Sequence, residues 1–138
     1  MAILGGGPGG PVGSSNSFTG TANALEIVGN HISGLSGLSN FDNNAAELIN
    51  FETGSYYCVL QFIPTRSDTD SADSQCRVYF NDTIVLVMPT SSGSATTNIG
   101  QPTRLIVPAY TQLKVDQLNV SNTSNLTGGI AITGELYR

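Results

Sequence analysis

The side chains that could carry out chemistry are few in this chain of 138 residues, which has one histidine, two cysteines and no tryptophan. Asp68, Asp70 and Asp73 lie close together in the sequence. Clustered carboxylates can begin to supply the oxygen ligands of a hard cation such as Ca²⁺. Because the segment lacks the glycine and the closing glutamate of an EF-hand loop, we interpret it as a solvated acidic loop and predict no metal ligands.

His31 is the residue on which an enzyme would most depend. A small hydrolase or lyase would need it within hydrogen-bond distance of a carboxylate and a nucleophile. The sequence contains no nucleophile elbow or comparable local signature around a serine or a cysteine. We therefore predict that His31 is a loop or strand-edge residue, that there are no catalytic residues, and that the chain is not an enzyme.

The glycine-rich start of the chain, GGGPGG at 5–10, formally contains the pattern G-x-G-x-x-G. A dinucleotide site needs a strand before this pattern and a helix after it, so that backbone amides point at a pyrophosphate. Neither is predicted here, and we expect no cofactor. Residues 1–16 instead have the composition of a flexible Gly/Pro-rich arm. We predict that this arm binds a partner, with its large apolar side chains as anchors: Met1, Ile3, Leu4 and Val12.

Charge narrows the range of partners. The formal net charge is -5, and only 11% of the residues are charged, so the chain has no basic face with which to neutralise many phosphates. We therefore expect it to bind neither nucleic acid nor membranes. No basic start followed by an apolar stretch resembles a targeting segment, and we expect a chain made in the cytoplasm.

The elements that must position these residues are short strands. Apolar and polar residues alternate, or form short apolar runs, between turn residues from residue 18 onward. We predict strands at 24–28, 47–52, 56–63, 76–80, 83–88, 103–107, 113–120 and 130–136. Pro64 is expected to end the strand at 56–63, and a weak strand is possible within 31–39. Residues 17–138 then form one all-β domain, a β-sandwich or jelly roll of about eight antiparallel strands.

The two cysteines lie inside apolar runs. Because Cys58 and Cys76 each fall within a predicted strand, we expect two buried thiols. A disulfide between them is the alternative if their strands are neighbours.

Five tyrosines leave two interpretations open. Tyrosine combines a large contact area with a polar tip, so these residues could anchor a protein interface or a sugar-binding face. They could equally be half-buried residues at sheet edges. The residues concerned are Tyr56, Tyr57, Tyr79, Tyr110 and Tyr137.

The order of several segments resembles a known group of proteins. After the glycine-rich arm come TGTANALE at 19–26, FETGSYY at 51–57, RVYFND at 77–82, VPAYT at 107–111 and TGELY at 133–137. Together they resemble the small β-sandwich structural proteins of tailed phages. The resemblance is one of general character, carried by turns and strands, and no functional residue follows from it.

The resemblance implies a virion structural protein, specifically a capsid decoration (cement) protein on the outer shell. Such a protein, made in the host cytoplasm, would bind the major capsid protein and copies of itself as a trimer or dimer, and would bridge neighbouring capsomers. Because many copies act together, a modest interface per copy suffices. The alternative is a receptor-binding or fibre-tip β-sandwich that recognises host surface glycans, for which aromatic side chains should line a groove between the two Ser/Thr/Gly-rich loops at 90–98 and 121–129.

Overall fold

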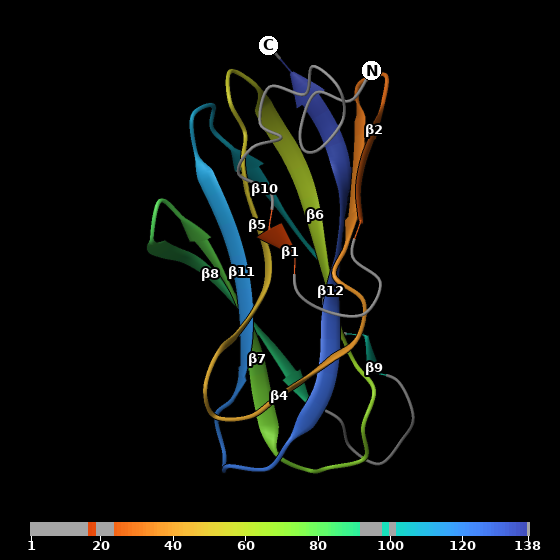
Figure 1. Cartoon of the computed structure of the whole chain (residues 1–138), viewed down its shortest axis with the longest axis vertical. Coiled ribbons are helices and arrows are strands. Elements are labelled where there is room, and N and C mark those ends of the chain that lie inside the picture. Colours follow the sequence, from red (N-terminus) through yellow and green to blue (C-terminus); the bar gives the residue numbers. More distant parts are fainter. Residues whose placement is uncertain (1–16, 19–23, 92–97, 100–101, 138) are drawn as a thin grey trace.

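Two antiparallel sheets face each other in a computed structural model of the chain (Figure 1). The structure describes residues 17–18, 24–91, 98–99 and 102–137. This part of the chain contains strands and no helix, hence none that could cross a membrane. The predicted all-β sandwich is therefore confirmed. The predicted arm at 1–16 lies outside the described residues, together with Met1, Ile3, Leu4 and Val12.

The described residues form twelve strands, more than the eight or so predicted. The five-stranded sheet has the order β1 (Ser17–Phe18), β5 (Ala46–Glu52), β11 (Gln112–Asn119), β7 (Asp73–Phe80) and β8 (Thr83–Ser91). The seven-stranded sheet has the order β10 (Thr103–Val107), β6 (Tyr57–Arg66), β12 (Leu126–Tyr137), β3 (His31–Leu35) and β2 (Ala24–Val28). In the same sheet, β4 (Ser39–Phe41) pairs with β12 and β9 (Asn98–Ile99) pairs with β6.

The core lies between the two sheets and is built by the inward residues of each strand. One side of it is formed mainly by β6 and β12, with contributions from β2, β3 and β10, and the other by β5, β7, β8 and β11. The alternation predicted for 76–80 and 130–136 holds, since the apolar residues of those runs point inward. The largest fully buried apolar side chains include Phe51, Phe62, Leu60, Leu113, Ile32 and Ile132.

Strand β5 departs from simple alternation at Leu48. Val115 of β11 pairs with Ile49 and Asp116 with Glu47, so Leu48 is an extra residue in a β-bulge. Leu48 and Ile49 are both fully buried as a result. A run that alternates in sequence therefore contributes two consecutive residues to the core.

Pro64 does not end its strand, contrary to the prediction. Strand β6 continues through it to Arg66. On one side of β6, the pairing with β10 extends only as far as Phe62, and the pairing with β9 starts at Thr65. Pro64 therefore lies in the gap between these two partners, where the N–H that proline lacks is not required. The connection between the predicted strands 56–63 and 76–80 is shorter than predicted, because β6 ends at Arg66 and β7 already begins at Asp73.

Both cysteines are buried and free, as predicted. Cys58 lies on β6 and Cys76 on β7, and these strands belong to different sheets. Burial raises the pKa of each thiol to about 12. The thiols are therefore protonated at neutral pH and have little thiolate character.

Strand β8 forms one edge of the five-stranded sheet. It follows a two-residue turn in which Asn81 and Asp82 both have positive φ, at 49° and 67°, as a tight hairpin turn requires even without glycine. Val85 is an extra residue between Leu86, which pairs with Val78, and Ile84, which pairs with Tyr79. Pro89 lies further along, and an edge is where a strand tolerates proline.

Candidate functional site

The outer face of the seven-stranded sheet carries polar side chains in register. Successive residues of a strand point to opposite faces, so pairing partners across neighbouring strands share a face. One row runs from β10 to β2 through Arg104, Gln61, Thr133, Ser33 and Glu26. The next row consists of Ile106, Val59, Glu135, His31 and Val28. Five strands thus contribute polar side chains to this face.

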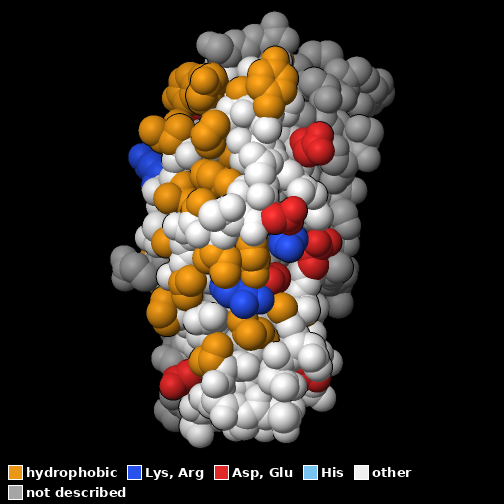
Figure 2. Space-filling view, turned by 90° about the vertical axis from the view of Figure 1, so that its left-hand side faces the viewer, with side chains coloured by type: hydrophobic (Ala, Val, Ile, Leu, Met, Phe, Trp, Pro, Cys, Tyr) orange, Lys and Arg blue, Asp and Glu red, His pale blue; other side chains and the backbone are white. Residues whose placement is uncertain are grey.

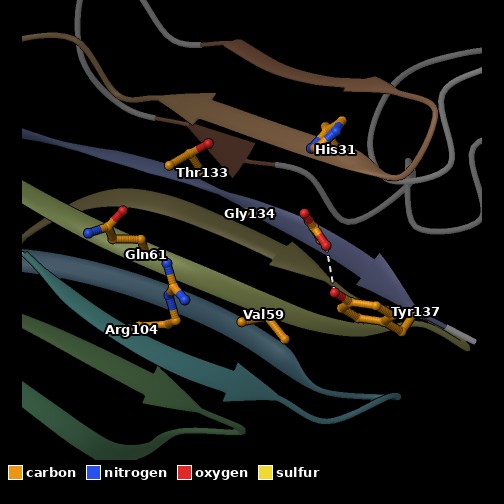
Figure 3. A pocket seen from close by; sticks show the side chains of 8 residues that line it. His31, Val59, Gln61, Arg104, Thr133, Gly134 and Tyr137 are labelled. Atoms are coloured by element: carbon orange, nitrogen blue, oxygen red, sulfur yellow. Dashed lines mark hydrogen bonds between the residues drawn. The ribbon is translucent and has the colours of Figure 1, made fainter.

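These rows border a hollow of about 300 Å³, which we call the polar hollow. Figure 3 shows its side chains on one side of the sheet, with Arg104 from β10 extending toward Gln61 on β6. Thr133 and Tyr137 come from β12, and His31 from β3. The complete lining is His31, Val59, Gln61, Arg104, Thr133, Gly134, Glu135 and Tyr137.

Gly134 allows the two central strands of this face to approach closely. A Cβ atom at this position would overlap the carbonyl oxygen of Val59 on β6 and lie 3.0 Å from the Cα atom of Leu60. Any side chain here would push β6 and β12 apart. The absence of a side chain at residue 134 therefore fixes the spacing of the strands that carry Gln61 and Glu135.

Tyr137 lines one end of the polar hollow, and a second tyrosine is its register partner on the neighbouring strand. Tyr57 and Tyr137 are register partners on β6 and β12, and each is about half exposed. The Tyr137 hydroxyl donates a 2.5 Å hydrogen bond to Glu135 Oε2 (Figure 3). This hydrogen bond raises the pKa of Tyr137. The carboxylate of Glu135 is thereby held over the hollow as an acceptor.

The other tyrosines have separate surroundings. Tyr56 packs against the core, and Tyr110 is exposed in a turn with φ of 56°. Tyr79 lies on the outer face of the five-stranded sheet, where its hydroxyl donates to Asp116 Oδ2 at 3.0 Å and the Nζ atom of Lys114 lies 4.3 Å from its ring centre. The sequence left two interpretations open for the tyrosines, a binding role and a structural one. Only Tyr57 and Tyr137 lie where they could form an aromatic border of a ligand site.

His31 is the exposed first residue of β3, which pairs with β12 on one side and β2 on the other. Its register partner on β12 is Glu135. In the described part of the chain, no hydrogen bond joins the His31 side chain to a carboxylate or a hydroxyl group. The structure thus brings His31 beside a carboxylate without the hydrogen-bonded arrangement that general base catalysis uses.

The acidic segment differs from the solvated loop that the sequence suggested. Arg66, which is fully buried, donates through Nη2 to Asp68 Oδ1 at 2.7 Å and to the Asp70 carbonyl at 2.8 Å. Its Nη1 donates to the carbonyl of Ala72 and to Ser74 Oγ. The loop therefore folds around a buried guanidinium, and its carboxylate neutralises that charge.

The charge of Asp68 is stabilised by the same contacts. Burial raises the pKa of its carboxyl, but hydrogen bonds from Arg66 and from the backbone N–H of Thr127 outweigh burial and bring the pKa below its ordinary value. Asp73 lies apart, as the exposed first residue of β7. Within the described ranges, no three histidine, cysteine or acidic side chains gather as a metal site would require.

No family model and no curated protein matches the sequence. Among solved structures, the chain is similar to a family 35 carbohydrate-binding module from Clostridium thermocellum, with a TM-score of 0.41 and 15% identity over 80% of this chain and 86% of that one. It is also similar to dimeric latent PorU from Porphyromonas gingivalis, with a TM-score of 0.45 and 11% identity over 87% of this chain and 14% of that one. At these identities the likeness concerns the fold alone.

Proposed function

We propose that the protein is a non-catalytic β-sandwich module that binds a saccharide in the polar hollow. The observation that carries this proposal is the gathering of Arg104, Gln61, Thr133 and Glu135 in one hollow on an open sheet face. Each sugar hydroxyl is both a donor and an acceptor, and these side chains offer a guanidinium, an amide, a hydroxyl and a carboxylate. Such a set can pair with adjacent hydroxyl groups of one sugar ring.

The size, charge and border of the hollow support the same proposal. A volume of about 300 Å³ is at the lower end of the range for small-molecule sites. Arg104 and Glu135 carry opposite charges, so the hollow has no strong preference for an ion of one sign. The rings of Tyr57 and Tyr137 provide apolar area beside it, on which the C–H face of a sugar can pack.

Substitution of Arg104 tests the proposal directly. We expect Arg104→Ala to weaken the binding of the sugar selected on a glycan array by at least about tenfold, because a hydrogen bond to a charged group contributes about 1.5–3 kcal/mol. Isothermal titration calorimetry would measure the loss. The matched control is Lys114→Ala, which removes one positive charge from the outer face of the other sheet and should leave the affinity unchanged. Equal losses in both variants, or an array on which no glycan binds, would contradict the proposal.

Capsid decoration is a second candidate function, favoured by a different surface. Figure 2 looks at the side where β8 and β10 form the edges of the two sheets, and hydrophobic side chains are spread along it. Ile84, Val85 and Val87 of β8 and Ile106 of β10 are exposed there. A monomer seldom leaves a large contiguous apolar surface exposed to water. A capsid shell would cover this side if the protein bridged capsomers.

Cosedimentation with capsid shells isolated from a tailed phage whose genome encodes the chain would test this second candidate. We expect Val85→Asn combined with Val87→Asn to weaken binding to the shells at least about tenfold, since the change removes apolar contact area without altering charge. Val120→Asn, at an exposed position in the loop after β11, is the control. Wild-type protein that stays in the supernatant would exclude the decoration role.

A further inference from the structure

A second hollow adjoins the polar hollow on the same sheet face. It measures about 250 Å³, and its lining is mainly apolar: Leu35, Gly37, Leu38, Thr65, Ile130 and Ala131. The side chains of Leu35 and Leu38 are 48% and 40% exposed at its border. We call it the apolar hollow.

The two hollows lie end to end along β12. Thr133 lines the polar hollow and Ala131 lines the apolar hollow. These residues are two positions apart on one strand and point to the same face, so they lie about 7 Å from each other. On β3, Ser33 and Leu35 are the corresponding register partners. An extended molecule lying along β12 would therefore pass from polar to apolar surroundings within the length of one sugar ring.

We propose that the ligand of this face is an amphipathic glycoside, whose sugar lies in the polar hollow and whose alkyl or acyl group lies in the apolar hollow. This inference rests on the proposed function and specifies the class of saccharide. A free sugar would leave the apolar side chains at 131, 35 and 38 in water. An attached chain of a few carbons would bury them, and hydrophobic burial contributes in proportion to the area removed from water.

The dimensions of the apolar hollow favour this occupant over a protein. A stable protein interface buries about 800 Å² on each partner. The apolar hollow offers the two exposed leucines and Ala131. Their apolar area is far smaller than the area that a stable protein interface buries. A lipid bilayer is a poor match as well, because the adjoining Arg104, Gln61 and Glu135 would have to be desolvated together. A short apolar group attached to a sugar fits both hollows, because the sugar can lie in the polar hollow and the apolar group in the apolar hollow.

Matched pairs of glycosides would test the inference. Methyl and octyl β-D-glycosides of glucose, galactose and N-acetylglucosamine are titrated by NMR into labelled protein, below the concentration at which the octyl forms make micelles. We expect at least one octyl glycoside to bind about tenfold or more tightly than its methyl partner, since the burial of about two CH₂ groups suffices for that factor. Leu35→Asn should remove the advantage and leave the affinity for the methyl glycoside unchanged, whereas the control Val120→Asn should retain it.

Several outcomes would overturn this inference without bearing on the proposed function, which the glycan array tests separately. If no octyl glycoside binds more tightly than its methyl partner, the apolar hollow does not take part. If 1-octanol binds as tightly as the octyl glycosides, the tail binds without the sugar. If the wild-type protein is a dimer by light scattering and Leu35→Asn converts it to a monomer, the occupant is a second copy of the chain. If the protein binds no glycan on the array, the proposed function itself is contradicted.

Discussion

Arg66→Met is expected to lower the free energy of unfolding by about 3–5 kcal/mol, which is the usual cost of removing one partner from a buried ion pair. Methionine fills similar space but cannot donate hydrogen bonds. The carbonyls of Asp70 and Ala72 and the carboxylate of Asp68 would lose the hydrogen bonds that Arg66 donates, and the charge of Asp68 would lose its cationic partner. Thermal denaturation followed by circular dichroism should show a melting temperature lower by about 10 °C or more.

Arg104→Met provides the control for this experiment. Arg104 is exposed on β10, and surface substitutions usually change stability by no more than about 0.5 kcal/mol. A loss of less than about 1 kcal/mol in Arg66→Met would mean that the loop at 67–72 holds its shape without the guanidinium, and the assigned role would be wrong.

Gly134→Ala is expected to destabilise the protein by about 2–3 kcal/mol and to weaken saccharide binding as well. The added methyl group would overlap the carbonyl oxygen of Val59, and overpacking in an ordered interior costs about 1–3 kcal/mol. Strands β6 and β12 can only respond by separating. Because these strands carry Gln61 and Glu135, the same shift would widen the polar hollow.

Chemical denaturation and calorimetry would measure the two effects of Gly134→Ala separately. For the stability measurement Ser33→Ala is a suitable control, since Ser33 is exposed on β3 next to β12 and its substitution adds no atom. A Gly134→Ala variant with unchanged stability would show that the close approach of β6 and β12 is not a requirement of the fold.

The strands were predictable because their signals are local. The sequence pattern located the strands at 24–28 and 103–107 with their observed bounds. Pro64 misled the prediction because its tolerance depends on a gap between β10 and β9, two partners distant in sequence. The bulge at Leu48 likewise depends on the register with β11.

The candidate site could not be predicted because it depends on strand order. Arg104, Gln61 and Thr133 lie far apart in the sequence and meet only when β10, β6 and β12 are neighbours in this register. Each residue alone is an ordinary polar residue on the outer face of a strand. Arg66 was missed for a similar reason, since its burial depends on the loop that folds over it.

The shape of strand β8 has a consequence for the protein at high concentration. An apolar edge strand is a template on which further chains can add, and repeated addition produces fibrils. The extra residue Val85 interrupts the regular spacing of backbone groups along this edge, and Pro89 removes a donor from it. An incoming strand would therefore find only a few consecutive partners. The side chains of β8 remain available for contact, while open-ended growth of the sheet is blocked.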